Sequence, residues 1–307
     1  MSIPIIDLQN CHSQELSNAC RDFGFFVLQG HDLTPALRSR AMSKIQAFFD
    51  QPKSIKNLIR RSDANCWGYF DNELTKNRQD WKEILDIGEV ETEGPMAGAN
   101  PQWPEDAEFV EAVQALRRVL HDTSIEVTRL VLNTFDAEVD LRDAFAKHTS
   151  FLRLNFYPPC PTPYNPQQHG SDVRAGELGI SHHTDAGAMT VLVQDEHPGL
   201  QVQHRDHWID VPAQPDALII NIGDVVQVWS NDLYPAPVHR VLANDSFSRI
   251  SVPYFLNPAY EYSYAPLVNH QTPRYSPINW GHFRAGRSAG DYADNGAEIQ
   301  ISDFKIA

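Results

Sequence analysis

Three residues of this chain have the types and the spacing of a metal site. His183 and Asp185 stand two positions apart, and His239 follows much later in the sequence. In a β-strand, residues i and i+2 point to the same face, so a strand here would place the imidazole and the carboxylate side by side. Two histidines and one carboxylate form the facial triad that binds non-haem Fe(II). The pattern therefore predicts an iron site with open coordination positions.

A second pair of residues could bind a carboxylate. Arg249 and Ser251 begin ten positions after His239, and their i, i+2 spacing again places both on one face of a strand. A planar guanidinium matches the fork of a carboxylate, and a buried cation is tolerable when its ligand neutralises it. We therefore predict a site for a carboxylate ligand on the same sheet as the metal.

With these two motifs, the chain resembles the Fe(II)/2-oxoglutarate-dependent oxygenase superfamily, in the branch of isopenicillin N synthase and the plant-type dioxygenases. The resemblance covers nearly the whole chain. It implies that His183, Asp185 and His239 hold Fe(II), while 2-oxoglutarate chelates the iron and O2 takes the last position. It also implies that the far carboxylate of 2-oxoglutarate binds Arg249 and Ser251.

A third motif supports the same resemblance. The stretch Asn155-Phe156-Tyr157-Pro158-Pro159-Cys160 is similar to the N-x-Y-P-x-C motif of this family. The match implies that Asn155 and Tyr157 line the co-substrate pocket.

Candidate substrate contacts come from two stretches, residues 68–70 and 80–83, that resemble segments flanking the active-site mouth in the plant-type family. The candidates are Tyr69, Phe70 and Trp81. The alternative is that these rings pack under a loop, because most large aromatic side chains lie in the core.

Two departures from the plant-type pattern lie near the expected pocket. One is the pair Pro235 and Pro237, which stiffens the approach to His239. The other is a polar insertion around residues 167–174, within a loop that could cover the site. It supplies Arg174 as a further substrate candidate, with a solvated loop position as the alternative.

The fold expected is mixed α+β. A long apolar stripe from Glu105 predicts a scaffold helix, with an interruption around Asp122-Thr123-Ser124. From Ser150 the sequence changes to short strands between turns, which is typical of a sandwich or jelly roll. A last helix is expected near Ile278 to Gly290.

The resemblance implies a double-stranded β-helix (jelly-roll) core with flanking helices. The expected organisation is one compact unit with four regions: an N-terminal non-haem dioxygenase region (1–104), the scaffold helix (105–149), the Fe(II)/2-oxoglutarate jelly-roll core (150–258) and a C-terminal helical tail (259–307).

Composition restricts the partners. The formal net charge of −15 argues against nucleic acid and anionic membranes, which need a basic surface. Four cysteines without C-x-x-C spacing and an N-terminus without an apolar signal segment favour reduced thiols in the cytoplasm. No apolar run approaches transmembrane length. We expect a cytoplasmic monomer that acts on a small molecule.

The main reading is an oxygenase that oxidises a C–H bond of a small molecule of specialised metabolism, by hydroxylation, desaturation or oxidative cyclisation, with release of succinate and CO2. One alternative is an oxidase of the isopenicillin N synthase or aminocyclopropane-carboxylate oxidase type, in which the Arg-x-Ser pair serves another carboxylate. Another is a non-catalytic binding protein on the same scaffold, against which the intact triad argues.

Overall fold

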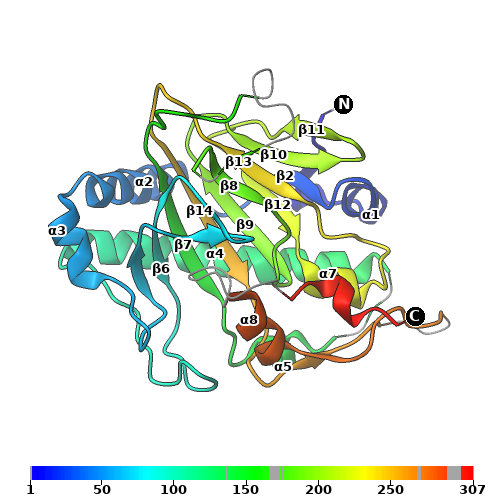
Figure 1. Ribbon diagram of the computed structural model, residues 1–307. Helices are drawn as coiled ribbons and strands as arrows, with labels where there is room; N and C mark the ends of the chain where they lie inside the picture. Colours follow the sequence, from blue (N-terminus) through cyan, green and yellow to red (C-terminus); the bar gives the residue numbers. More distant parts are fainter. Residues whose placement is uncertain are drawn as a thin grey trace.

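The computed structural model describes residues 2–135, 137, 139–165, 173–174, 176–267, 271–288 and 299–306. Two β-sheets form the centre of this part of the chain, and helices cover the outer face of the larger sheet (Figure 1). The architecture is the mixed α+β arrangement that the sequence predicts.

The larger sheet has eight strands in the order β1-β2-β12-β9-β14-β7-β6-β3. Successive side chains along its strands point to opposite faces, so the sheet separates two hydrophobic cores. On β2, Phe25 and Val27 pack into the space between the sheets, whereas Phe26 and Leu28 join the core on the helical side. The bounds are β1 Ile5–Asp7, β2 Phe25–Gln29, β3 Gly68–Phe70, β6 Glu83–Ile87, β7 Phe151–Tyr157, β9 Met189–Gln194, β12 Leu218–Ile222 and β14 Arg249–Leu256.

The smaller sheet has four strands in the order β11-β10-β13-β8. Its bounds are β8 Leu178–His183, β10 Leu200–His204, β11 His207–Asp210 and β13 His239–Leu242. Two further strand pairs are β4 Leu74–Thr75 with β5 Arg78–Gln79, and β15 Ser263–Tyr264 with β16 Ile278–Asn279. In the smaller sheet, β8 and β13 run antiparallel with His183 opposite His239, so their pairing brings the two predicted histidines together.

The helices are α1 Ser13–Asp22, α2 Pro35–Phe49, α3 Lys53–Lys56, α4 Ala107–Asn133, α5 Leu141–Phe145, α7 Asp224–Trp229 and α8 Trp280–Ser288, with 3-10 turns η1 Leu8–Asn10, η2 Asn57–Ile59 and η4 Ile301–Phe304. Within the described ranges, none of them has both the length and the apolar composition needed to cross a bilayer. The four cysteines are free thiols.

The long helix α4 runs behind the larger sheet and packs against α2 (Figure 1). The predicted interruption at Asp122-Thr123-Ser124 is wrong, because α4 is continuous from Ala107 to Asn133. Ser124 Oγ donates to the His121 carbonyl at 2.6 Å, and Thr128 Oγ1 donates to the Ser124 carbonyl at 2.7 Å. The hydroxyl groups of Ser124 and Thr128 are thus satisfied within the helix, which lets both residues stay helical and buried.

The C-terminal helix is confirmed in part. α8 covers Trp280–Ser288, while Ile278 belongs to a strand and the predicted end at Gly290 lies outside the described residues. Most of the loop expected to cover the site, residues 166–172 and 175, also lies outside them.

Candidate active site

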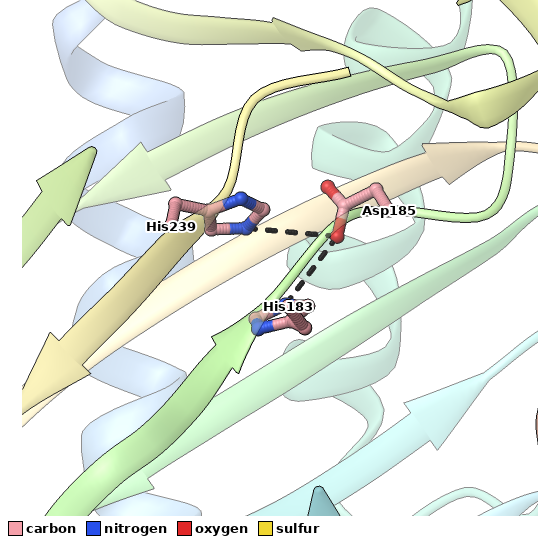
Figure 2. Close-up of side chains that lie close together, drawn as sticks. All are labelled: His183, Asp185 and His239. Atoms are coloured by element: carbon pink, nitrogen blue, oxygen red, sulfur yellow. Dashed lines mark ion pairs between the residues drawn. The ribbon is translucent and has the colours of Figure 1, made fainter. Parts of the chain in front are cut away.

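The three predicted metal ligands meet at one point (Figure 2). His183 ends β8 and His239 begins β13, and their ring centroids lie 4.3 Å apart. Asp185 Oδ1 lies 3.5 Å from Nε2 of His183 and 3.6 Å from Nε2 of His239. Asp185 itself lies in the loop after β8, and its backbone carbonyl accepts a hydrogen bond from the Asp224 N–H at 2.8 Å. The loop, rather than strand alternation, therefore places the carboxylate.

Backbone carbonyls orient both imidazoles. Nδ1 of His183 lies 2.9 Å from the Ser181 carbonyl, and Nδ1 of His239 lies 3.1 Å from the Pro237 carbonyl. A carbonyl only accepts, so each Nδ1 carries the proton and each Nε2 keeps its lone pair. Burial, followed by the charge of His239, lowers the pKa of His183 to about 4. Both Nε2 atoms face Asp185 and are suited to bind a cation.

The carboxylate of Asp185 is divided between two roles. Its Oδ2 accepts from Thr190 Oγ1 at 2.5 Å and from Asn221 Nδ2 at 2.8 Å, while Oδ1 faces the histidines. Burial acts to raise the pKa of Asp185, but His239, His183 and the Asn221 hydrogen bond hold it well below its usual range. The donor set of two neutral imidazoles and one ionised carboxylate fits Fe(II).

The four residues predicted to bind 2-oxoglutarate form two cross-strand pairs on β14 and β7, Arg249 with Tyr157 and Ser251 with Asn155. These strands belong to the larger sheet, whereas β8 and β13 with the metal histidines belong to the smaller one, so the prediction of one shared sheet is wrong and the two sites face each other across the cavity. Ser251 Oγ lies 3.2 Å from the Tyr157 hydroxyl and 3.4 Å from Asn155 Nδ2. The triad and these four residues line one cavity of about 560 Å3.

Arg249 shows that this pocket fits an anion. Its side chain is buried, Nη2 donates to Gln194 Oε1 at 3.0 Å, and Nε donates to the His197 carbonyl at 3.4 Å. Nη1 is buried with no acceptor among the described residues, none of whose carboxylates forms an ion pair with Arg249. A buried cation without a counter-charge is costly, which favours an anionic ligand at this position.

The four substrate candidates lie elsewhere, since none is among the described residues that line the cavity. Tyr69 is fully buried and donates to Glu83 at 2.8 Å, and Trp81 Nε1 donates to the Pro158 carbonyl at 3.0 Å. Phe70 lies under the Arg60 guanidinium, and Arg174 is exposed. The predicted substrate contacts are therefore not confirmed.

An ionic network that the motifs did not reveal forms another part of the cavity wall. Arg153 binds Asp86 through two hydrogen bonds of 2.7 and 2.8 Å, and its Nη1 lies 2.5 Å from Glu73. Lys82 pairs with Glu73 and, at 3.3 Å, with Asp80. Burial raises the pKa of Asp80 to about 6, whereas Glu73 and Asp80 keep the pKa of Lys82 above its usual value despite burial.

Strand periodicity could have revealed one member of this network. Arg153 stands two residues before Asn155 and four before Tyr157, so all three share one face of β7. The acidic partners come from separate segments, and no local pattern marks them.

The comparisons with known proteins agree with this geometry. The family model of the 2OG-Fe(II) oxygenase superfamily matches residues 148–258, and that of the N-terminal region of non-haem dioxygenases in morphine synthesis matches residues 3–106. Jasmonate-induced oxygenase 2 of Arabidopsis thaliana is 30% identical, with 98% of this chain and 83% of the relative covered. Codeine O-demethylase of Papaver somniferum is 28% identical, with 93% and 79% covered.

A solved structure leads to the same conclusion. The crystal structure of JOX2 in complex with 2OG, Fe and JA superposes with a TM-score of 0.79 at 30% identity, covering 93% of this chain and 84% of that one. These findings support the prediction of a 2-oxoglutarate-dependent oxygenase. They do not support the two alternatives, an oxidase that does not use 2-oxoglutarate and a non-catalytic binding protein. The chain belongs to the Fe(II)/2-oxoglutarate-dependent oxygenase superfamily, in its plant-type branch, and is an oxidoreductase of small molecules.

Proposed function

We propose that His183, Asp185 and His239 are the iron ligands, and that Arg249 and Ser251 bind the far carboxylate of 2-oxoglutarate. The observation that carries this proposal is the buried Arg249 guanidinium, which has no acidic partner among the described residues and shares one cavity with the triad. When bound, iron and 2-oxoglutarate would supply the oxidative chemistry, with release of succinate and CO2.

The protein's own contribution is orientation and exclusion of water. The two histidines present Nε2 because backbone carbonyls hold Nδ1. Arg249 offers a planar guanidinium to a carboxylate. Ser251, two positions further along β14, can donate another hydrogen bond. Asn155 and Tyr157 hold the Ser251 hydroxyl from the adjacent strand. The buried walls keep these charge interactions strong.

A binding measurement tests the role of Arg249. Replacing it in Arg249→Gln should weaken the affinity for 2-oxoglutarate about 10- to 100-fold, because hydrogen bonds to a charged group are lost in a buried site. Equilibrium dialysis under argon with Fe(II) present measures this affinity.

Arg240→Gln is the matched control, because Arg240 lies on the iron-ligand strand β13 but stacks on Trp208, at 4.1 Å, and is not among the cavity-lining residues of the described ranges. It should bind 2-oxoglutarate as the wild type does. Equal affinities for the wild type and Arg249→Gln would contradict the proposal.

We further propose that the enzyme oxidises a C–H bond of a small molecule of specialised metabolism. In the cell it would act as a cytoplasmic monomer without nucleic-acid or membrane partners. The relatives named for jasmonate, codeine and flavonoids support the substrate class. The strongly negative net charge supports the absence of a polyanionic partner. The regions 1–104, 105–149, 150–258 and 259–307 would act as one unit.

A further inference from the structure

The guanidinium group of Arg249 is held by neutral oxygen atoms. Its Nη2 donates to Oε1 of Gln194 at 3.0 Å, and its Nε donates to the His197 carbonyl at 3.4 Å. The first acceptor lies on the last residue of β9 and the second in the segment that follows this strand. Because an amide and a carbonyl carry no formal charge, they orient the guanidinium without compensating its positive charge.

The acidic residue beside Gln194 does not supply that compensation. Oδ2 of Asp195 accepts from the Ile250 N–H at 2.6 Å, and Oδ1 accepts from the His197 N–H at 3.0 Å. Both oxygens are therefore bonded to the backbone, and within the described ranges no carboxylate forms an ion pair with Arg249. Of two adjacent side chains, an amide and a carboxylate, the fold directs the amide to the guanidinium.

The amide of Gln194 is fixed from several sides. Its Nε2 donates to the Pro212 carbonyl at 2.9 Å, and Nη2 of Arg38 on α2 donates to the Gln194 carbonyl at 2.6 Å. Since the Pro212 carbonyl can only accept, the amide must turn its oxygen toward Arg249. Gln194 is buried opposite Ser251 of β14 and is not among the described residues that line the cavity. It can therefore act on a ligand only through Arg249.

We propose that Gln194 is a positioning residue that makes the co-substrate pocket selective for a 2-oxo diacid over a 2-oxo monoacid. The inference deepens the proposed function and rests on it. The far carboxylate of a diacid would neutralise the buried guanidinium, whereas an apolar chain end would leave it unpaired. A carboxylate in place of the amide would supply an internal counter-charge, and the pocket would then suit an uncharged chain end.

Two acids of equal length test this selectivity. 2-Oxoglutarate and 2-oxopentanoate share the five-carbon chain and the keto acid end, and they differ only in the far carboxylate. Protein loaded with Fe(II) is dialysed against each acid under argon, so that binding is measured without turnover. The wild type should bind 2-oxoglutarate about 100-fold more tightly, as expected when one partner of a buried charge pair is removed.

Two variants of Gln194 separate charge from shape. Gln194→Glu should reduce this affinity ratio at least about tenfold, because it weakens the binding of 2-oxoglutarate and strengthens that of 2-oxopentanoate. Gln194→Met has a similar size but no acceptor and no charge. It should weaken 2-oxoglutarate binding several-fold without any gain for 2-oxopentanoate. The affinity for Fe(II) should stay at the wild-type value in both variants.

Gln201→Glu is the matched control. Gln201 also accepts from an arginine, Nε of Arg240 at 2.9 Å, but it lies on the smaller sheet and is not among the cavity-lining residues of the described ranges. It should keep the wild-type affinity ratio.

The outcomes separate this inference from the proposed function. A wild type that prefers 2-oxoglutarate, with an unchanged ratio or an equal loss of both affinities in Gln194→Glu, would overturn the inference alone, since a merely structural role affects both acids alike. A wild type that binds both acids equally would contradict the proposed role of Arg249 and, with it, this inference.

Discussion

The side chains behind the triad decide how well it can hold a metal. Asn221 and Thr190 both donate to Oδ2 of Asp185, which leaves Oδ1 directed at the histidines. Partners of this kind fix the orientation of a ligand and its basicity. Asn221 lies on β12 of the larger sheet, so it connects the metal site to the rigid core.

At this scale we predict that Asn221→Ala weakens the affinity for Fe(II) about 10- to 100-fold, because Asp185 loses the donor that holds its carboxylate. Anaerobic metal titration measures the effect. Asn18→Ala is the control, since Asn18 makes only an exposed contact with Gln14 among the contacts of the described residues. An unchanged affinity in Asn221→Ala would show that the other contacts of Asp185 suffice to orient it.

Single residues also mark where sequence reasoning succeeds. His183, Asp185 and His239 could be predicted because ligand types and spacing express the chemistry directly. The carbonyls of Ser181 and Pro237 could not, since any residue supplies a carbonyl and only the fold decides where it points. Tyr69 was misleading because an aromatic side chain beside a motif packs in the core as readily as it faces a substrate.

Between elements, the start of α7 packs tightly against the loop that carries Asp185. A Cβ on Gly223 would lie 2.2 Å from the Gly187 carbonyl oxygen and 2.9 Å from that of Asp185. The backbone φ of −108° suits any residue, so the constraint at Gly223 is steric.

Gly223→Ala should therefore destabilise the protein by about 1–3 kcal/mol and weaken its affinity for Fe(II), because the metal loop must move. Urea unfolding and metal titration measure the two effects. Gly98→Ala is the comparison: its Cβ would meet no atom within 4 Å, and its φ of +96° adds only backbone strain of about 1 kcal/mol. Wild-type iron affinity in Gly223→Ala would contradict this role of α7.

A second contact between elements should make stability depend on pH. His148, just before β7, lies 4.9 Å from His121 of α4, measured between ring centroids. Burial, followed by the charge of His121, lowers the pKa of His148 from 6.5 to about 4. The unfolded chain therefore binds this proton more readily than the folded protein does, so stability is greatest above pH 6.5 and falls as the pH decreases toward 4.

His148→Gln should abolish the part of this acid-induced loss of stability that is due to His148, which amounts to at most about 3 kcal/mol for a pKa shift of this size. Urea unfolding of the metal-free wild type and variant at pH 7 and pH 4.5 isolates the contribution. The unfolding free energy of the wild type minus that of the variant should be larger at pH 7 than at pH 4.5. A difference independent of pH would show that His148 does not take up the proton.

In the whole molecule, the cavity lies between two sheets and is completed by the C-terminal helix. The ion pair of Arg284 with Glu91 joins positions 193 residues apart, and Arg287 donates to the Thr184 carbonyl beside the metal ligands. The fold class and the strands that carry the motifs could be predicted, because alternating apolar residues and turn residues are local features of the sequence. The cavity wall could not, since distant segments supply it and their pairing depends on the complete fold.

The formation of succinate tests the central claim most directly. Protein purified under argon receives Fe(II), then O2, with and without 2-oxoglutarate. We predict slow, 2-oxoglutarate-dependent succinate formation even without added substrate, lost in Asp185→Ala and Arg249→Ala and retained in Arg240→Gln. Iron-loaded protein that forms no succinate, or Arg249→Ala with wild-type turnover, would contradict the assignment of these residues to a 2-oxoglutarate-dependent oxygenase site.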